Sequence, residues 1–119
     1  MEKNEKRDIH ERIYKYVINV LLFIRKIPKT SENVIIIGQL ARSVTSMGAN
    51  DQEADGAHTK KDFISKYSIV RKETKETIYW LRMLSDLNPR LLREGQELVE
   101  EGIEIAKIVS TIIYNTSKR

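Results

Sequence analysis

The segment DQEADGAHTKKD, residues 51–62, spaces its acidic side chains almost as a calcium-binding loop does. Carboxylates stand at its first, third, fifth and twelfth positions, and a glycine stands at the sixth, where an EF-hand loop bends sharply. Three positions argue against calcium: Glu53 is an unusual third ligand, His58 replaces an apolar residue, and Asp62 replaces the bidentate glutamate. We therefore expect no calcium site here.

A helix boundary explains more of the same segment. The apolar phase of the preceding residues continues toward Asp55, so the helix is expected to end there. Gly56 is then predicted to adopt the left-handed conformation that often follows a helix. Thr59 is predicted to cap the next helix, with Asp62 in its first turn.

The other chemistry-bearing residues do not form a catalytic or metal-binding pattern. The chain has no cysteine, and it contains no nucleophile elbow, phosphate loop or Glu-x-x-His pair. His10 and His58 lie on different segments near predicted helix ends, which favours surface or capping roles over metal ligation. We expect no catalytic residue, no metal and no cofactor.

A basic stripe is the first candidate binding surface. Its residues lie in the stretch KKDFISKYSIVRKETKETIYWLR and share one side of a predicted helix. The expected nucleic-acid contacts are Arg71, Lys75 and Arg82, with Lys61, Lys72 and Tyr79 near the edge of the stripe. Such a stripe can follow phosphates, and the alternative is an ordinary solvated helix face.

A polar stripe is the second candidate. Ser46, Asn50 and Glu53 recur at helical spacing beside an apolar face, where they should approach Lys72, Glu73 or Glu76 of the next helix. Arg42 is the sixth residue assigned to this polar network, with Ser46, Asn50, Glu53, Glu73 and Glu76. Buried polar groups need partners, so we expect a hydrogen-bonded network that fixes the register of the helices. A ligand or metal pocket is the alternative.

Length and composition limit the elements that position these residues. A chain of 119 residues with 40% hydrophobic content suits a single domain, residues 1–119. The charged start and the short apolar runs predict neither a signal peptide nor a membrane span, so a cytoplasmic protein is expected. A net charge of +4 permits contact with RNA or DNA without requiring it.

Hydrophobic periodicity predicts an all-α protein. Apolar residues recur every three or four positions over 8–27, 32–55, 60–86 and 89–114. Pro28 ends the first helix, Ser31 is the expected cap of the second, and Asn88 is the expected cap of the fourth, which frays from Asn115. Short connections predict an antiparallel, up-and-down four-helix bundle.

Surplus apolar residues predict a homo-oligomer. In the fourth helix they cover about half of the circumference, more than the ~100° stripe that one core needs. Gly95 and Gly102 fall in the same arc, which indicates close helix packing. The expected contacts between subunits are Ile69, Trp80, Met83, Ile108 and Ile113. The alternative is that they fill a thick core.

Two stretches, QLARSVTSMGANDQEA and KKDFISKYSIVRKETKETIYWLRML, together resemble a known family. It comprises the four-helix-bundle proteins encoded within intervening sequences of bacterial 23S rRNA genes, often labelled S23 ribosomal proteins. The chain departs from the pattern at Arg71, Lys72 and Glu73, where many members have glycine and serine after an arginine. The positions that carry the resemblance are Arg42, Ser43, Ser46, Ala49, Asn50, Glu53, Asp62, Phe63, Lys72, Glu73, Glu76, Trp80 and Leu81.

The resemblance implies a ring-shaped, often pentameric bundle of uncharacterised role. A more distant relative, the accessory protein of diversity-generating retroelements, binds a reverse transcriptase and nucleic acid. Two functions therefore stay open: association with RNA or DNA through the basic stripe, or a scaffold for a protein partner without nucleic-acid contact. A ligand-binding or enzymatic bundle is the distant third.

Overall fold

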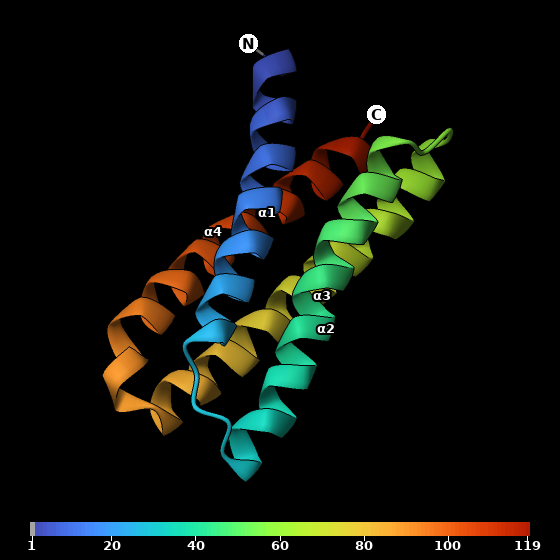
Figure 1. Cartoon of the computed structure of the whole chain (residues 1–119). Helices are drawn as coiled ribbons and strands as arrows, with labels where there is room; N and C mark the ends of the chain where they lie inside the picture. Colours follow the sequence, from blue (N-terminus) through green and yellow to red (C-terminus); the bar gives the residue numbers. More distant parts are fainter. Residues whose placement is uncertain (1) are drawn as a thin grey trace.

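The described residues form four long helices (Figure 1). The computed structural model describes the backbone of residues 2–119 and the side chains of residues 9–119. The helices are α1 (Glu2–Arg25), α2 (Ser31–Asp55), α3 (Lys60–Leu87) and α4 (Leu92–Ser117), and a short 3-10 turn, η1 (Pro89–Leu91), precedes α4. The described part of the chain contains no strand, so the all-α prediction is confirmed.

The helices alternate in direction, and both chain termini lie at the same end of the bundle (Figure 1). α3 packs extensively against α2 and α4, whereas α1 makes fewer contacts, also with α2 and α4. The bundle is elongated, with extents of 47 × 25 × 19 Å. None of the helices, over the residues described, is long and apolar enough to cross a membrane.

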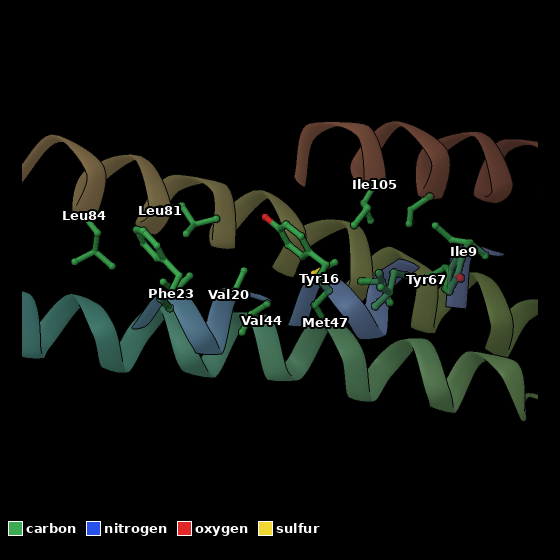
Figure 2. Packing of buried hydrophobic residues seen from close by; sticks show 14 of the residues in the cluster. Ile9, Tyr16, Val20, Phe23, Val44, Met47, Tyr67, Leu81, Leu84 and Ile105 are labelled. Atoms are coloured by element: carbon green, nitrogen blue, oxygen red, sulfur yellow. The ribbon is translucent and has the colours of Figure 1, made fainter. Parts of the chain in front are cut away.

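One continuous core runs between the helices (Figure 2). α1 shows why the chain folds in this way, because its buried residues recur every three or four positions and so form a single stripe along the helix. That stripe consists of Ile9, Ile13, Tyr16, Val20 and Phe23, and the buried Ile27 follows just beyond the end of α1. Tyr16 is the buried residue of this stripe with a polar group, and its hydroxyl donates a hydrogen bond to the Leu98 carbonyl at 2.9 Å.

A threonine caps the N-terminus of α2 and another caps the N-terminus of α3. The Thr59 hydroxyl accepts a hydrogen bond from the Asp62 amide at 3.0 Å, which confirms the predicted cap of α3. The cap of α2 is Thr30, which accepts from the Asn33 amide at 3.2 Å. The prediction of Ser31 was wrong by one residue, because both residues offer a hydroxyl and only the backbone geometry selects between them.

Three other predictions about helix ends were wrong. Gly56 follows α2 with φ of −93°, outside the left-handed region, since the chain leaves the helix through a right-handed turn. Asn88 does not cap the next helix; its side chain donates to the Leu84 carbonyl at 2.8 Å and exchanges hydrogen bonds with Asn33. α4 also continues to Ser117 in place of fraying at Asn115.

Gly95 and Gly102 mark the closest approach of α4 to its neighbours, as their spacing predicted. A Cβ atom at Gly102 would lie 2.8 Å from Ile78 of α3 and 2.5 Å from the Tyr16 hydroxyl of α1. At Gly95 it would overlap Ser85 of α3. The two glycines therefore let three helices approach closely, which offsets their low helix propensity.

Candidate functional site

A charged cluster joins α2 to α3 on one side of the bundle. Arg42 of α2 forms ion pairs with Glu76 and, at 3.5 Å, with Glu73. The hydrogen bond with Glu76 raises the pKa of the Arg42 guanidinium above its ordinary value. Trp80 donates its indole N–H to Glu76 at 3.3 Å, and the Ser46 hydroxyl lies 3.4 Å from a Glu73 oxygen.

Glu73 is the buried member of this cluster, with 6% of its surface exposed. Its Oε2 faces Arg42 and Ser46, while its Oε1 has no hydrogen-bond partner among the described protein groups. A buried carboxylate is tolerated where a cation and donors compensate its lost hydration. Arg42 is the cation that compensates Glu73, and its own side chain is half-exposed at the surface of the bundle.

Of the other two residues in the predicted polar stripe, Asn50 contacts this cluster and Glu53 does not. The Asn50 amide donates to the Ser46 carbonyl at 2.9 Å, so it remains with the cluster. Glu53 does not join it: its carboxylate pairs with Lys66 of α3 at 2.7 Å and is largely exposed. The predicted partners of Glu53 were wrong. Helical spacing shows which side of α2 carries Glu53, but it does not show which residue of α3 lies opposite.

A second, more deeply buried cluster surrounds Asp51, whose exposed fraction is 1%. The His10 Nδ1 of α1 lies 2.9 Å from both oxygens of Asp51, and the Tyr67 hydroxyl of α3 donates to Asp51 at 2.7 Å. The His10 Nε2 lies 3.3 Å from Asp55. Burial, followed by the charge of Asp51, raises the pKa of Tyr67 above its ordinary value. This cluster ties three helices together.

The sequence did not identify the Asp51 cluster. His10 was assigned a surface or capping role, which is wrong, because its ring turns inward to a carboxylate of α2. The available signal was the apolar phase of α2, which continues through Asp51 and so places that carboxylate on the buried side. The carboxylate oxygens of Asp51 lie against His10 and Tyr67, so this side chain faces the interior of the bundle. The described side chains contain no group of three or more potential ligands that suits a metal ion.

A groove opens between α1 and α2 beside this cluster, with a volume of about 440 Å³. Tyr14 and Val17 form its α1 wall, and Thr45, Gly48 and Ala49 form its floor on α2. The surrounding surface of α1 exposes Tyr14, Ile18 and Leu22 to 63%, 39% and 44%. None of these residues was a predicted contact.

The predicted basic stripe lies on the outer surface of α3. Lys61, Lys72, Lys75 and Arg82 are exposed and Arg71 is half-buried. None of the five forms an ion pair with a described side chain. Tyr79 is 54% exposed and packs edge-on against Trp80, with ring centroids 4.9 Å apart. These cations are free to meet an anion, and contact with nucleic acid remains a prediction.

The residues predicted to join subunits lie partly buried within one chain. Trp80, Met83, Ile108 and Ile113 pack against the core, and Ile69 is half-buried. More exposed apolar side chains occur elsewhere, on α1 and along α4. Contact between subunits through the five predicted residues remains a prediction.

The fold and these clusters define an antiparallel four-helix bundle whose polar residues fasten helices to one another. Residues 5–111 match the family model of the 23S rRNA-intervening sequence protein, and the chain belongs to this family. It is also similar to the crystal structure of a protein of unknown function from the S23 ribosomal protein family of Bacteroides thetaiotaomicron VPI-5482. The two share 27% sequence identity with a TM-score of 0.83, over 92% of this chain and 97% of the other. No curated protein matches the sequence.

Proposed function

We propose that this protein is a non-enzymatic, cytoplasmic homo-oligomer that binds RNA through the outer surface of α3. The observation that carries the proposal is the set of cations on that surface without ion-pair partners among the described side chains, beside an exposed tyrosine. Unpaired lysine and arginine side chains attract phosphates, and an exposed aromatic ring can stack on a base. The set is Lys61, Arg71, Lys72, Lys75, Tyr79 and Arg82.

Assembly strengthens this proposal. A few cations per subunit give weak attraction, but repetition around a ring gives one large positive surface. A pentameric ring is the assembly that the family resemblance implies. The net charge of +4 per chain agrees in sign with such a surface.

The test compares RNA binding of two triple variants that change net charge equally. Lys61→Glu, Arg71→Glu and Lys72→Glu remove cations from α3, whereas Lys15→Glu, Arg25→Glu and Arg90→Glu remove exposed cations elsewhere. With a fluorescent single-stranded RNA, we expect the α3 variant to bind at least about tenfold more weakly than the control variant. Equal loss in the two variants, or no binding by the wild-type protein, contradicts the proposal.

The second candidate function is a protein scaffold without direct RNA contact. The groove between α1 and α2 and the exposed Tyr14, Ile18 and Leu22 favour it, because apolar surface of this kind commonly receives a partner. A reverse transcriptase is the partner that the distant resemblance suggests. This function predicts that Ile18→Lys abolishes partner binding while the α3 triple variant retains it, and the RNA-binding function predicts no effect of Ile18→Lys on RNA affinity.

A further inference from the structure

One row of side chains runs along the outer side of α3, away from the core. Its members recur at alternating spacings of four and three residues, which keeps them on one side of a helix. All of them except Ser68 are exposed, and the row contains no aliphatic residue. The row consists of Lys61, Ser65, Ser68, Lys72, Lys75, Tyr79 and Arg82. Tyr79 is thus an aromatic residue on an otherwise polar and basic surface.

Tyr79 stands between cations of this row. Lys75 is one helical turn before it and Arg82 is one turn after it, about 6 Å and about 4.5 Å away along the helix axis. Lys72 lies two turns before it on the same side. None of these three cations forms an ion pair with a described side chain. A polyanion that follows the row therefore meets positive charge on both sides of the ring.

The other strongly exposed tyrosines of the described chain have different neighbours. Tyr14 of α1 is 63% exposed, and it lies in an apolar surface with Ile18 one turn away. Tyr114 of α4 is 59% exposed, but Nζ of Lys118 lies over its ring, 4.8 Å from the centroid. Tyr79 combines an open ring with cations that have no such internal contact.

The ring of Tyr79 is held in place from one side. It packs edge-on against Trp80, with ring centroids 4.9 Å apart. Trp80 is itself anchored, because it packs against the core and its indole N–H donates to Glu76 at 3.3 Å. Tyr79 still has 54% of its surface exposed. A ring positioned in this way loses little conformational freedom when a flat partner stacks on it.

We propose that the outer surface of α3 binds single-stranded RNA, with Tyr79 stacking on an unpaired base and with Lys75 and Arg82 contacting the phosphates beside that base. Stacking on an aromatic side chain between cations is the common way in which proteins hold a single strand. The inference rests on the proposed function, and it adds the class of RNA that this surface accepts.

Stacking explains why the ligand is a single strand and not a duplex. In duplex RNA the faces of the bases are stacked on one another, so an aromatic ring on a helix surface does not reach them, and recognition relies on shape and phosphates. In a single strand the bases splay out, and every base presents a face to an aromatic ring. Tyr79 therefore contributes to binding of the single strand alone, with little preference for sequence.

The test compares a fluorescent single-stranded RNA with a blunt RNA duplex that has the same number of phosphates, at one salt concentration. We expect the wild-type protein to bind the single strand more tightly. Tyr79→Leu removes the ring and should weaken binding of the single strand at least about fivefold while the affinity for the duplex stays within about twofold. Tyr79→Phe keeps the ring and should stay within about twofold of the wild type for both RNAs.

A matched control is Tyr14→Leu, which removes an exposed tyrosine of α1 and should leave both affinities unchanged. Circular dichroism of each variant checks that the helices remain intact. No RNA binding by the wild type, or equal losses in the α3 triple variant and its control, overturns the proposed function and this inference with it. Binding that depends on the α3 cations but is equal for single strand and duplex, or is unchanged in Tyr79→Leu, overturns the single-strand inference alone.

Discussion

Asp51 shows how one buried carboxylate can join three helices. Its partners come from α1 and α3, and both ring nitrogens of His10 lie near carboxylates, Asp51 on one side and Asp55 on the other. A carboxylate accepts hydrogen bonds, and the Tyr67 hydroxyl and a ring N–H of His10 are the groups placed to donate to Asp51. The buried Asp51 side chain therefore has polar partners from two other helices, as a buried polar group requires.

Removing one donor from Asp51 tests this role. Tyr67→Phe keeps the buried ring but deletes the hydroxyl that donates to Asp51 at 2.7 Å. We expect a loss of about 1–3 kcal/mol in the free energy of unfolding, because hydrogen bonds to charged groups are the stronger ones. Urea unfolding measures it. Tyr79→Phe, at an exposed hydroxyl, is the control and should change stability by less than about 0.5 kcal/mol; equal effects of the two changes contradict the role of Asp51.

Stability should also fall at alkaline pH because of Tyr16 and Tyr67. Burial raises the pKa of both hydroxyls above the ordinary value of 10.0. Above pH 10 the unfolded chain loses these protons while the folded chain keeps them, so their contribution is complete below pH 10 and declines as pH rises. We expect a decline of about 1.4 kcal/mol per pH unit for each tyrosine. Unfolding curves from pH 9 to pH 11 measure it, and a slope unaltered by Tyr16→Phe contradicts the assignment.

Single residues were the scale at which the sequence was least informative. Helical spacing placed Ser46 and Asn50 of α2 opposite Glu73 of α3, where the structure brings them together, and Arg42 entered only through the family motif. The same reasoning missed His10, because its partner Asp51 is 41 residues away and no local pattern links them. Side-chain partners between helices depend on rotation and tilt, which periodicity does not determine.

At the scale of the helices, sequence patterns were more successful. The four apolar repeats correspond to the four helices, and the Thr59 cap is as predicted. Errors fell at helix ends, where Thr30 and Ser31 offer the same hydroxyl and where Asn88 prefers a tertiary partner, Asn33, to the following helix. Tertiary contacts thus override local capping preferences.

Two glycines in helix interiors predict opposite effects of alanine. Gly102→Ala forces a methyl group against Ile78 and Tyr16, and we expect a loss of about 1–3 kcal/mol in unfolding free energy. A Cβ at Gly38 of α2 meets no atom within 4 Å, so Gly38→Ala should gain up to about 1 kcal/mol through helix propensity. Thermal unfolding compares them. A neutral or stabilising Gly102→Ala contradicts the close packing of α4.

At the scale of the whole molecule, the sequence predicted the all-α bundle and the family. The apolar repeats are long enough to determine four helices, and the motif residues of α2 and α3 carry the family resemblance. The function was less accessible, because the motif residues mostly hold helices together. Arg42, Glu73 and Glu76 form a cluster between α2 and α3, and such a cluster indicates an architecture more directly than a ligand.

The salt dependence of RNA binding tests the proposed function most directly. Binding through phosphate contacts should weaken linearly in log Kd against log salt concentration, with a slope of about 0.7 for each phosphate contacted on a single strand. We therefore expect the variant with Lys61→Glu, Arg71→Glu and Lys72→Glu to show a shallower slope than the wild-type protein. A wild-type affinity that is independent of salt, or an identical slope in the variant, would contradict RNA binding by the outer surface of α3.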